Sequence, residues 1–317
     1  MAPALADLAF VRSRRGPGRT TGTRRYNPAD MTTDETTGLP TATEGSTDVT
    51  DPAAMTGPDA AGRADGDGEL APEHEIPRYD DLRYRDVFWA ARDYEDRCDR
   101  VAIRALLPVM GERLIEVGAG YGRLADEYRG FREIVLFDAS PAHVEAAREE
   151  FRNDPQVRVE QGDAYSLPFP DATFDAVVCV RVVHHLEHPE AVFAEFSRVL
   201  RPGGVLVLEF ANKRNLKAVI RRALRRQSWS PFTTEPHEYL PLHFDRHPLE
   251  IRRMLRHAGL RVEATRAVSL FRLPILRGRM PAGWLAALER PLQGPLGSVT
   301  PGPSVYVRAR KAGQVRS

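Results

Sequence analysis

The stretch "LIEVGAGYGR", residues 114–123, places three glycines within five positions, directly after an apolar run that ends in an acid. Glycine has no Cβ atom, so Gly118, Gly120 and Gly122 permit either a tight turn or the close approach of another group to the backbone. A helix that follows such a turn presents its N-terminal N–H groups at the same place. The stretch therefore predicts a strand, a tight turn and a helix start that together can receive a ligand.

The chain around this turn alternates between apolar strands and helices. Uninterrupted apolar strands that alternate with helices indicate a parallel sheet covered on both faces. We therefore expect an α/β protein with a Rossmann-like, doubly wound, mostly parallel seven-stranded sheet and an inserted cap after the fifth strand. The expected strands are residues 113–118, 133–138, 157–163, 174–181, 205–210, 261–268 and 303–310.

Two acids follow strands that neighbour the glycine turn. In a doubly wound sheet the ligand lies at the carboxyl ends of the strands, where the strand order reverses. Asp138 ends the second strand, where a carboxylate can accept both hydroxyls of a ribose, and Asp163 follows the third, where it can accept from an adenine amino group. The run Gly118-Ala119-Gly120-Tyr121-Gly122 departs from the dinucleotide spacing G-x-G-x-x-G. The pattern favours an adenosine-bearing ligand other than a dinucleotide.

Four segments resemble, in the same order, the motifs of class I S-adenosylmethionine-dependent methyltransferases. They are "LIEVGAGYGRL", "VLFDAS", "GDAYSLPFPDATFDAVVCVRVVHHLEHP" and "LRPGGVLVLEF". The small-molecule branch related to quinone-biosynthesis methyltransferases is the most similar. The resemblance covers about residues 85–210 and implies S-adenosyl-L-methionine as the cofactor and methyl transfer to a small-molecule acceptor by in-line displacement.

The resemblance also implies roles for residues near the glycine turn. Glu116 and the backbone of Gly118, Ala119 and Gly120 would hold the amino-acid end of the cofactor, and Tyr94 on the preceding helix would cover it. The alternative for Glu116 is a carboxylate that caps the turn.

Residues after the next three strands would hold the rest of the cofactor. The resemblance implies that Asp138 binds the ribose and that Ala139 lies beside the adenine. Asp163 and Ala164 would contact the adenine from the other side, and Arg181 would line the methionine end. The alternative for Asp138 is an acid that caps the following helix.

Histidines next to the methyl-delivery end are candidate bases. Some acceptors must lose a proton during methyl transfer, and imidazole is suited to take it. His184 and His185 lie in "VVHHLEH", and we favour His185, although imidazoles at such a place also serve as structural hydrogen-bonding groups. A metal bound by His184 and His188 is disfavoured because Pro189 interrupts the helix they would need and no carboxylate completes the set. No metal is expected.

The segment after the fifth strand is the most individual part of the chain. Residues 215–227 form a basic amphipathic helix, for which three roles stay open: a lid, contact with a membrane surface, or contact with an anionic substrate. Aromatic residues and the acid–base candidates His237, Tyr239 and His243 follow. We expect residues 211–245 and 268–300 to be cap or substrate elements, and the acceptor to be aromatic or lipophilic.

The totals restrict the remaining possibilities. The 317 residues include 45 basic and 44 acidic side chains, so the net charge does not point to nucleic acid. Residues 1–75 are poor in apolar side chains and predict a disordered tail, which leaves residues 76–317 as one domain. With only two cysteines and no apolar stretch of about 18 residues, a cytoplasmic protein is the simplest interpretation.

Three alternatives to a methyltransferase remain open. They are an NAD-dependent oxidoreductase or an aminopropyl transferase on a similar sheet, and a non-catalytic module that binds a nucleoside cofactor. The glycine spacing weighs against the first two.

Overall fold

The computed structural model describes residues 92–272 and 278–313, together with Trp89 and Leu276. The expected tail, residues 1–75, lies outside the described residues. The first described helix, α1 (Asp93–Leu106), shows the apolar periodicity expected from the sequence, with Cys98, Ile103 and Leu106 buried.

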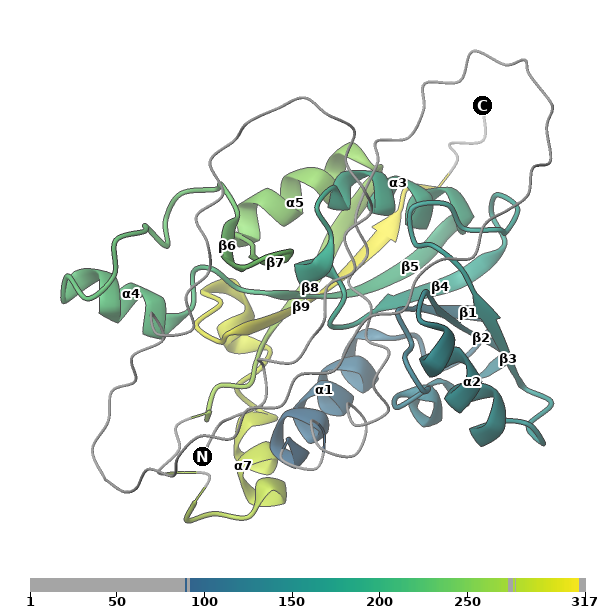
Figure 1. Ribbon diagram of the computed structural model, residues 1–317, viewed down its shortest axis with the longest axis horizontal. Coiled ribbons are helices and arrows are strands. Elements are labelled where there is room, and N and C mark those ends of the chain that lie inside the picture. Colours follow the sequence, from purple (N-terminus) through teal and green to yellow (C-terminus); the bar gives the residue numbers. More distant parts are fainter. Residues whose placement is uncertain (1–88, 90–91, 273–275, 277, 314–317) are drawn as a thin grey trace, which may run out of the picture. The chain divides into compact units, whose positions relative to one another are not determined.

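A seven-stranded sheet forms the centre of the described part (Figure 1), and its strand order is β3-β2-β1-β4-β5-β9-β8. Strands β1 to β5 pair in parallel, whereas β9 runs antiparallel to both β5 and β8. This topology confirms the predicted doubly wound, mostly parallel sheet. The strands are β1 (Gly111–Val117), β2 (Phe131–Asp138), β3 (Val157–Gln161), β4 (Phe174–Cys179), β5 (Leu200–Ala211), β8 (Leu260–Val268) and β9 (Ser304–Lys311).

Helices cover both faces of the sheet, as continuous apolar strands require. All six residues of β4 are buried, which agrees with its central place. Alternate strand residues face opposite sides, so Ile115 packs with α3 (Pro189–Val199) and α5 (Pro248–His257), while Leu114 packs with α1 and α7 (Ala282–Glu289). The remaining core helix, α2 (Pro141–Glu150), follows β2 with Ser140 as its N-cap.

Some local elements differ from the sequence expectation. The short helix expected after the glycine turn is a four-residue 3-10 turn, η3 (Ala125–Tyr128), whose Ala125 and Tyr128 are buried with residues of α1. A two-stranded hairpin, β6 (His237–Leu240) and β7 (His243–Asp245), lies where the sequence indicated only an aromatic-rich run. The remaining helical elements are α4 (Leu216–Ala223), η4 (Val183–His185) and η5 (Pro295–Ser298).

None of the helices among the described residues is both long enough and apolar enough to cross a membrane.

The strand order reverses between β1 and β4, since the chain moves outward from β1 to β3 and then returns to β4 on the other side. Ligands of doubly wound sheets bind at the carboxyl ends of the strands beside this point. The ends of β1, β2 and β4 therefore define where the functional site should lie.

Candidate functional site

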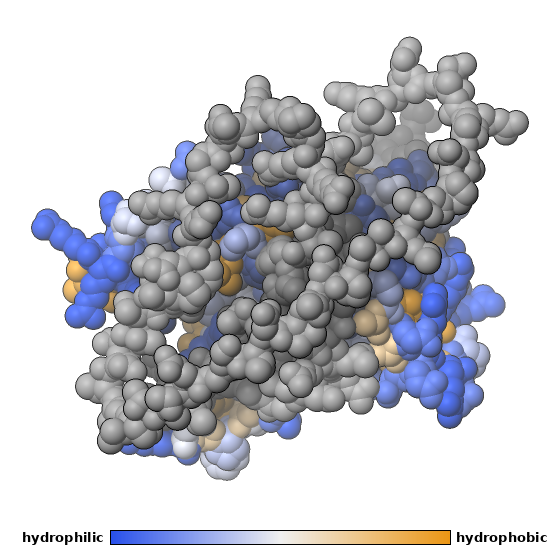
Figure 2. Space-filling model, viewed as in Figure 1, coloured by the Kyte–Doolittle hydropathy of each residue, from blue (hydrophilic) through white to orange (hydrophobic). Residues whose placement is uncertain are grey.

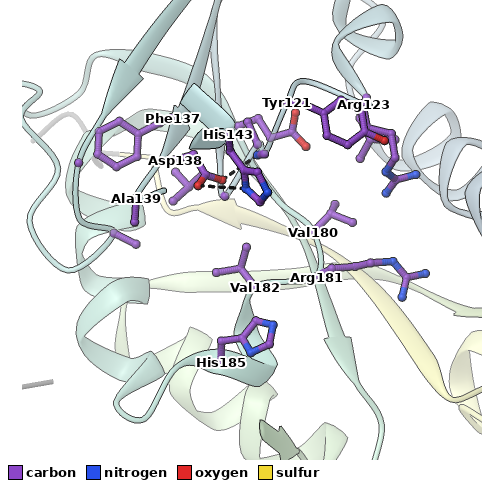
Figure 3. Close-up of a pocket in the computed structure, with 18 of the residues that line it drawn as sticks. Tyr121, Arg123, Phe137, Asp138, Ala139, His143, Val180, Arg181, Val182 and His185 are labelled. Atoms are coloured by element: carbon purple, nitrogen blue, oxygen red, sulfur yellow. Dashed lines mark hydrogen bonds and ion pairs between the residues drawn. The ribbon is translucent and has the colours of Figure 1, made fainter. Parts of the chain in front are cut away.

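A pocket lies at the carboxyl ends of β1, β2 and β4, beside the point where the strand order reverses (Figure 3). It brings together nine of the ten residues that the sequence assigned to the cofactor, and Tyr94 is the exception. The nine are Glu116, Gly118, Ala119, Gly120, Asp138, Ala139, Asp163, Ala164 and Arg181.

The glycine turn has the left-handed backbone that its sequence predicts. Gly118 has φ = +78° and Gly120 has φ = +57°, in a region of backbone conformation that residues other than glycine rarely adopt. A Cβ on Gly118 would lie 2.0 Å from Cγ2 of Val182, so the turn also packs directly against the chain after β4. Around Gly120, by contrast, a Cβ would approach only Nδ1 of His143, at 3.9 Å. The backbone at Gly120 is therefore open to a ligand.

Asp138 connects the glycine turn to the helix after β2. Its Oδ2 accepts a hydrogen bond from the Gly120 N–H at 2.7 Å, and its Oδ1 accepts one from the Ser140 N–H at 2.9 Å. Nδ1 of His143 lies 3.7 Å from Oδ1. The carboxylate thus does cap the neighbouring backbone, yet its two oxygens offer about four acceptor positions. It can accept further hydrogen bonds from a ligand in the pocket.

Glu116 contributes a buried carboxyl group to the lining of the pocket. The residue is only 2% exposed, and its Oε2 has no hydrogen-bond partner among the described residues. Burial raises the pKa of Glu116 to about 8, although the nearby Arg123 acts in the opposite direction. Burial of a carboxylate oxygen that has no hydrogen-bond partner is unfavourable. A ligand that carries a hydrogen-bond donor or a positive charge would relieve this cost, and the amino-acid end of S-adenosylmethionine supplies such a group.

Arg181 is held in an unusual conformation after β4. It is a non-glycine residue with φ = +60°, and its N–H donates to Oε2 of Glu209 at 2.9 Å. Its guanidinium binds the fully buried Asp99 of α1 at 3.1 Å. Backbone conformations of this kind persist where the surroundings hold them in place. Two buried acids therefore hold Arg181 in the lining of the pocket.

Aromatic and basic residues that the sequence did not single out also line the pocket. The guanidinium of Arg123 lies 3.7 Å from the centroid of the Trp89 ring, and that of Arg181 lies 5.3 Å from it. Tyr121, inside the glycine turn, is a further lining residue. The alternating Arg and aromatic residues gave no sequence signal because they come from three separate segments.

Asp163 and Ala164 line the side of the pocket formed after β3. Oδ1 of Asp163 accepts a hydrogen bond from the Tyr165 N–H at 2.9 Å, which closes a local turn. Both residues are placed as the sequence expected, and their contact with an adenine remains a proposal.

Tyr94 lies away from the pocket, contrary to the expected cofactor cover. Its side chain is buried between α1 and α7, where its hydroxyl donates to Glu289 and accepts from the Phe271 N–H at 2.7 Å. Helical spacing showed that Tyr94 faces inward, but it could not show that α7 covers this face. Trp89 and Tyr121 are better placed to cover a ligand.

Three histidine rings gather beside the pocket. His185 lines the pocket, across the cavity from Asp138 in Figure 3, and its ring centroid lies 3.9 Å from that of His184 and 4.6 Å from that of His243. Burial, followed by the charge of Arg181, lowers the pKa of His184 to about 3, and burial lowers the pKa of His185 as well. Both rings are therefore neutral at physiological pH. Within the described residues, no three His, Cys, Asp or Glu side chains are grouped so that they could hold a metal ion.

The other acid–base candidates lie on the β6–β7 hairpin. Nδ1 of His243 is 2.9 Å from the Pro241 carbonyl oxygen, which can only accept, so Nδ1 carries a proton. The Tyr239 ring lies 5.8 Å from that of His243. His237 instead stacks on Trp229 at 4.2 Å, and neither His237 nor Tyr239 lines the cofactor pocket. The hairpin thus brings His243 and Tyr239 toward His185 but leaves His237 apart.

These features define a doubly wound protein with a nucleoside-type pocket at the switch point of its sheet. A family model described as a methyltransferase domain matches residues 115–208, which span the end of β1, the strands β2 to β4 and most of β5. The matched segment therefore contains the glycine turn, Asp138 and Asp163.

Comparison with known proteins extends this match. The chain is 33% identical over 147 residues to phosphatidylethanolamine N-methyltransferase of Cereibacter sphaeroides, covering 44% of this chain and 72% of that protein. It is 34% identical over 119 residues to demethylmenaquinone methyltransferase of Clavibacter sepedonicus, covering 37% and 49%. A solved S-adenosylmethionine-dependent methyltransferase from Thermotoga maritima has the same fold, with a TM-score of 0.52 and 22% identity over 72% of this chain and 95% of the other.

The chain belongs to the class I S-adenosylmethionine-dependent methyltransferases, and S-adenosyl-L-methionine is the cofactor of this family. It spans only 40–49% of the length of several other curated relatives that it matches. The matched region is the cofactor half, so the acceptor must be inferred from the remaining residues.

Proposed function

We propose that this protein transfers a methyl group from S-adenosylmethionine to a small-molecule acceptor by in-line displacement. The observation that carries the proposal is the convergence of Glu116, the Gly118–Gly120 backbone and Asp138 on one pocket. The unpartnered, buried Oε2 of Glu116 supports a cationic group of the ligand at that place. The names of the relatives, which act on phosphatidylethanolamine and demethylmenaquinone, support a small-molecule acceptor.

The acceptor side of the pocket is bordered by His185 and by the hairpin that carries His243 and Tyr239. These rings support an aromatic or lipophilic acceptor, because they bring several flat ring faces together on which such a molecule can stack. His185 is the first candidate for a base because it lines the pocket, and His184 and Tyr239 are secondary candidates. His237 is the least suitable candidate because it stacks on Trp229 and does not line the pocket.

We also propose that residues 211–245 and 268–300 serve as cap elements, that residues 215–227 make peripheral contact with a membrane, and that the protein is cytoplasmic. The part of the first proposal that concerns residues 211–245 is supported by the His185–His243 ring contact, which joins the segment after β5 to the pocket. The proposed location follows from the low cysteine content alone.

Calorimetry on the full chain tests the cofactor assignment. We expect S-adenosylmethionine and its demethylated product to bind, and NADH not to bind. Binding of NADH without binding of the sulfonium compound would favour an oxidoreductase and overturn the proposal.

Turnover requires a second experiment. A methyl-labelled cofactor is incubated with the protein and a metabolite and lipid extract, and label is expected to enter an organic-soluble product. Tight cofactor binding with no transfer to any fraction would instead indicate a non-catalytic binding module.

A further inference from the structure

Helix α4 turns its apolar side toward water. Leu216 and Ile220 follow one another at a spacing of four residues, and Leu224 continues the same row directly after the helix. These three side chains are 56%, 48% and 59% exposed. An amphipathic helix of a globular protein normally buries such a row against the core. Here Ala218, on the opposite side, is the only buried residue of the helix.

Positive charges surround this apolar row. Five exposed cations, Lys217, Arg221, Arg222, Arg225 and Arg226, lie on the helix and on the turn after it. The sequence contains no acidic residue between Glu209 and Glu235, so nothing in this segment neutralises them. Figure 2 shows apolar atoms beside strongly hydrophilic ones at the left edge, where α4 lies in Figure 1.

The protein holds α4 in this orientation by contacts at its first turn. The Leu216 N–H donates to the Pro301 carbonyl at 2.9 Å, and Oδ1 of Asn215 accepts from the Ala218 N–H at 2.9 Å as an N-cap. The amide of Asn212, just before the helix, donates to the carbonyls of Thr300 and Gly302 at 2.7 and 2.8 Å. These contacts at the first turn set the direction in which the apolar row faces when α4 is formed.

We propose that α4 and the turn after it form an anchor that binds a lipid bilayer rich in anionic headgroups. An apolar row flanked by cations lies in the plane of such a surface, with the apolar side chains below the headgroups and the cations paired with phosphates. The exposed Phe232, in the loop that leads to the β6–β7 hairpin, adds to the apolar surface. We call Leu216, Ile220, Leu224 and Phe232, with the five cations, the α4 anchor.

The α4 anchor is connected to the acceptor side of the site. Nζ of Lys213, at the root of α4, donates to Oγ1 of Thr233 at 2.8 Å and to the Glu235 carbonyl at 2.5 Å. These contacts fix the start of the hairpin whose His243 meets His185. Membrane binding would therefore place the hairpin close to the bilayer surface. This consequence rests on the proposed function, and it implies that the acceptor is dissolved in or attached to the membrane.

Vesicle flotation with the full chain tests the anchor. The probes are vesicles of phosphatidylcholine alone and vesicles of phosphatidylcholine mixed with phosphatidylglycerol. We expect binding to the mixed vesicles, weakened by salt, and little binding to the neutral ones. A triple variant, L216S/I220S/L224S, should lose about tenfold or more of this binding, because each buried apolar side chain contributes to it.

Charge reversal tests the second half of the anchor. R221E/R225E should also lose about tenfold or more of the binding to anionic vesicles. The matched controls are V109S/M110S, which removes exposed apolar side chains elsewhere, and R132E/R148E, which reverses exposed cations elsewhere. Because residues 11–25 also contain several arginines, the difference between variant and wild type is the readout.

The outcomes separate the anchor from other uses of the same surface. Equal losses in the anchor and control variants, or no loss in any variant, would overturn the proposal. A dimer in light scattering that the L216S/I220S/L224S change converts to a monomer would also overturn it, because the apolar row would then bind a second copy. Affinity for S-adenosylmethionine serves as the folding control in every variant. If the wild type does not bind the cofactor, the proposed function is wrong. The vesicle experiment still tests the α4 anchor independently of that result.

Discussion

The cofactor pocket and the α4 anchor depart from the usual distribution of residues in opposite ways: the first buries polar groups, and the second exposes apolar ones. Around the pocket, polar groups such as Glu116, Asp99 and Glu209 are buried, and the oxygens of Asp99 and Glu209 bind Arg181 or Ser304. At the anchor, large apolar side chains such as Leu216 and Leu224 are exposed. Buried polar groups and exposed apolar rows both cost stability in an isolated protein. Each therefore marks a place where the chain is adapted to something outside itself.

The two regions also differ in how widely they are shared. All the residues that line the pocket except Trp89 lie within residues 115–208, which match the methyltransferase family model, whereas α4 and the hairpin lie beyond it. Binding the same cofactor imposes the same constraints on the first region in every member. The second region is free to vary with the acceptor, so it contains the properties that distinguish this protein from its relatives.

Gly118→Ala should produce the largest effect in the pocket region. The new Cβ would lie 2.0 Å from Val182 Cγ2, and φ is +78°. Left-handed strain of about 1–2 kcal/mol and overpacking of about 1–3 kcal/mol predict a loss of about 2–5 kcal/mol in the free energy of unfolding. Urea denaturation measures it.

Gly203 provides the matched control for this change. It has the same φ of +78°, but a Cβ there would meet nothing within 4 Å. Gly203→Ala should therefore show the strain alone, about 1–2 kcal/mol. If the two variants lose the same free energy of unfolding, the contact of the new Cβ with Val182 adds no destabilisation. The turn would then not be closely packed against Val182.

Asp138→Ala should weaken S-adenosylmethionine binding by about 100-fold. The change removes the charged acceptor of the ribose hydroxyls, and hydrogen bonds to a charged group contribute about 1.5–3 kcal/mol. It also frees the N–H groups of Gly120 and Ser140. Calorimetry measures the dissociation constant.

The half-buried Asp245 of the hairpin tests whether this effect is confined to the pocket. Asp245→Asn should leave cofactor affinity unchanged because Asp245 does not line the cofactor pocket. If Asp138→Ala binds the cofactor as tightly as the wild type, the assignment of the ribose site is wrong.

The pocket could be predicted from the sequence better than the rest of the molecule, for a physical reason. Gly118, Asp138 and Asp163 follow successive parallel strands, and the carboxyl ends of parallel strands meet at one edge whatever the remaining chain does. Tyr94 was assigned wrongly to the pocket side because its partner Glu289 lies 195 residues away. The contact of His185 with His243 also depends on a hairpin that sequence patterns did not show. Local periodicity indicates which side faces inward, but tertiary packing decides the partner.

Cofactor affinity should depend on pH through Glu116. Burial raises the pKa of this carboxyl to about 8, so the free protein holds it protonated at neutral pH. A cationic ligand group favours the carboxylate, so binding releases a proton. Below about pH 7.5, where an α-amino group keeps its proton, affinity should therefore rise with pH by at most about tenfold per unit.

Calorimetry in two buffers with different ionisation enthalpies detects the released proton. Glu116→Gln should remove the buffer dependence and the pH dependence together.

The raised pKa of Glu116 has the opposite consequence for the stability of the free protein. Because a raised carboxyl pKa means that the folded chain holds more protons than the unfolded chain, Glu116 makes stability fall as pH rises from about 4.5 to about 8. The free energy of unfolding of the cofactor-free protein is measured across this pH range. If it rises with pH in the wild type relative to Glu116→Gln, the assignment is wrong.

The smallest effects should come from two helix N-caps, one in each region. Ser140 caps α2 and Asn215 caps α4, and loss of such a cap costs about 1 kcal/mol. Helix α2 buries Val144 and Ala147 against the core, so Ser140→Ala should lower the global free energy of unfolding by about this amount.

Helix α4 buries only Ala218, so it can open without the rest of the protein. Asn215→Ala should therefore leave the denaturation midpoint unchanged and speed hydrogen exchange at the α4 amides alone. Addition of anionic vesicles should restore the protection of these amides, since a bound bilayer would cover the apolar row. A global loss of stability in Asn215→Ala would show instead that α4 is part of the cooperative core, and that its exposed row is not an independent anchor.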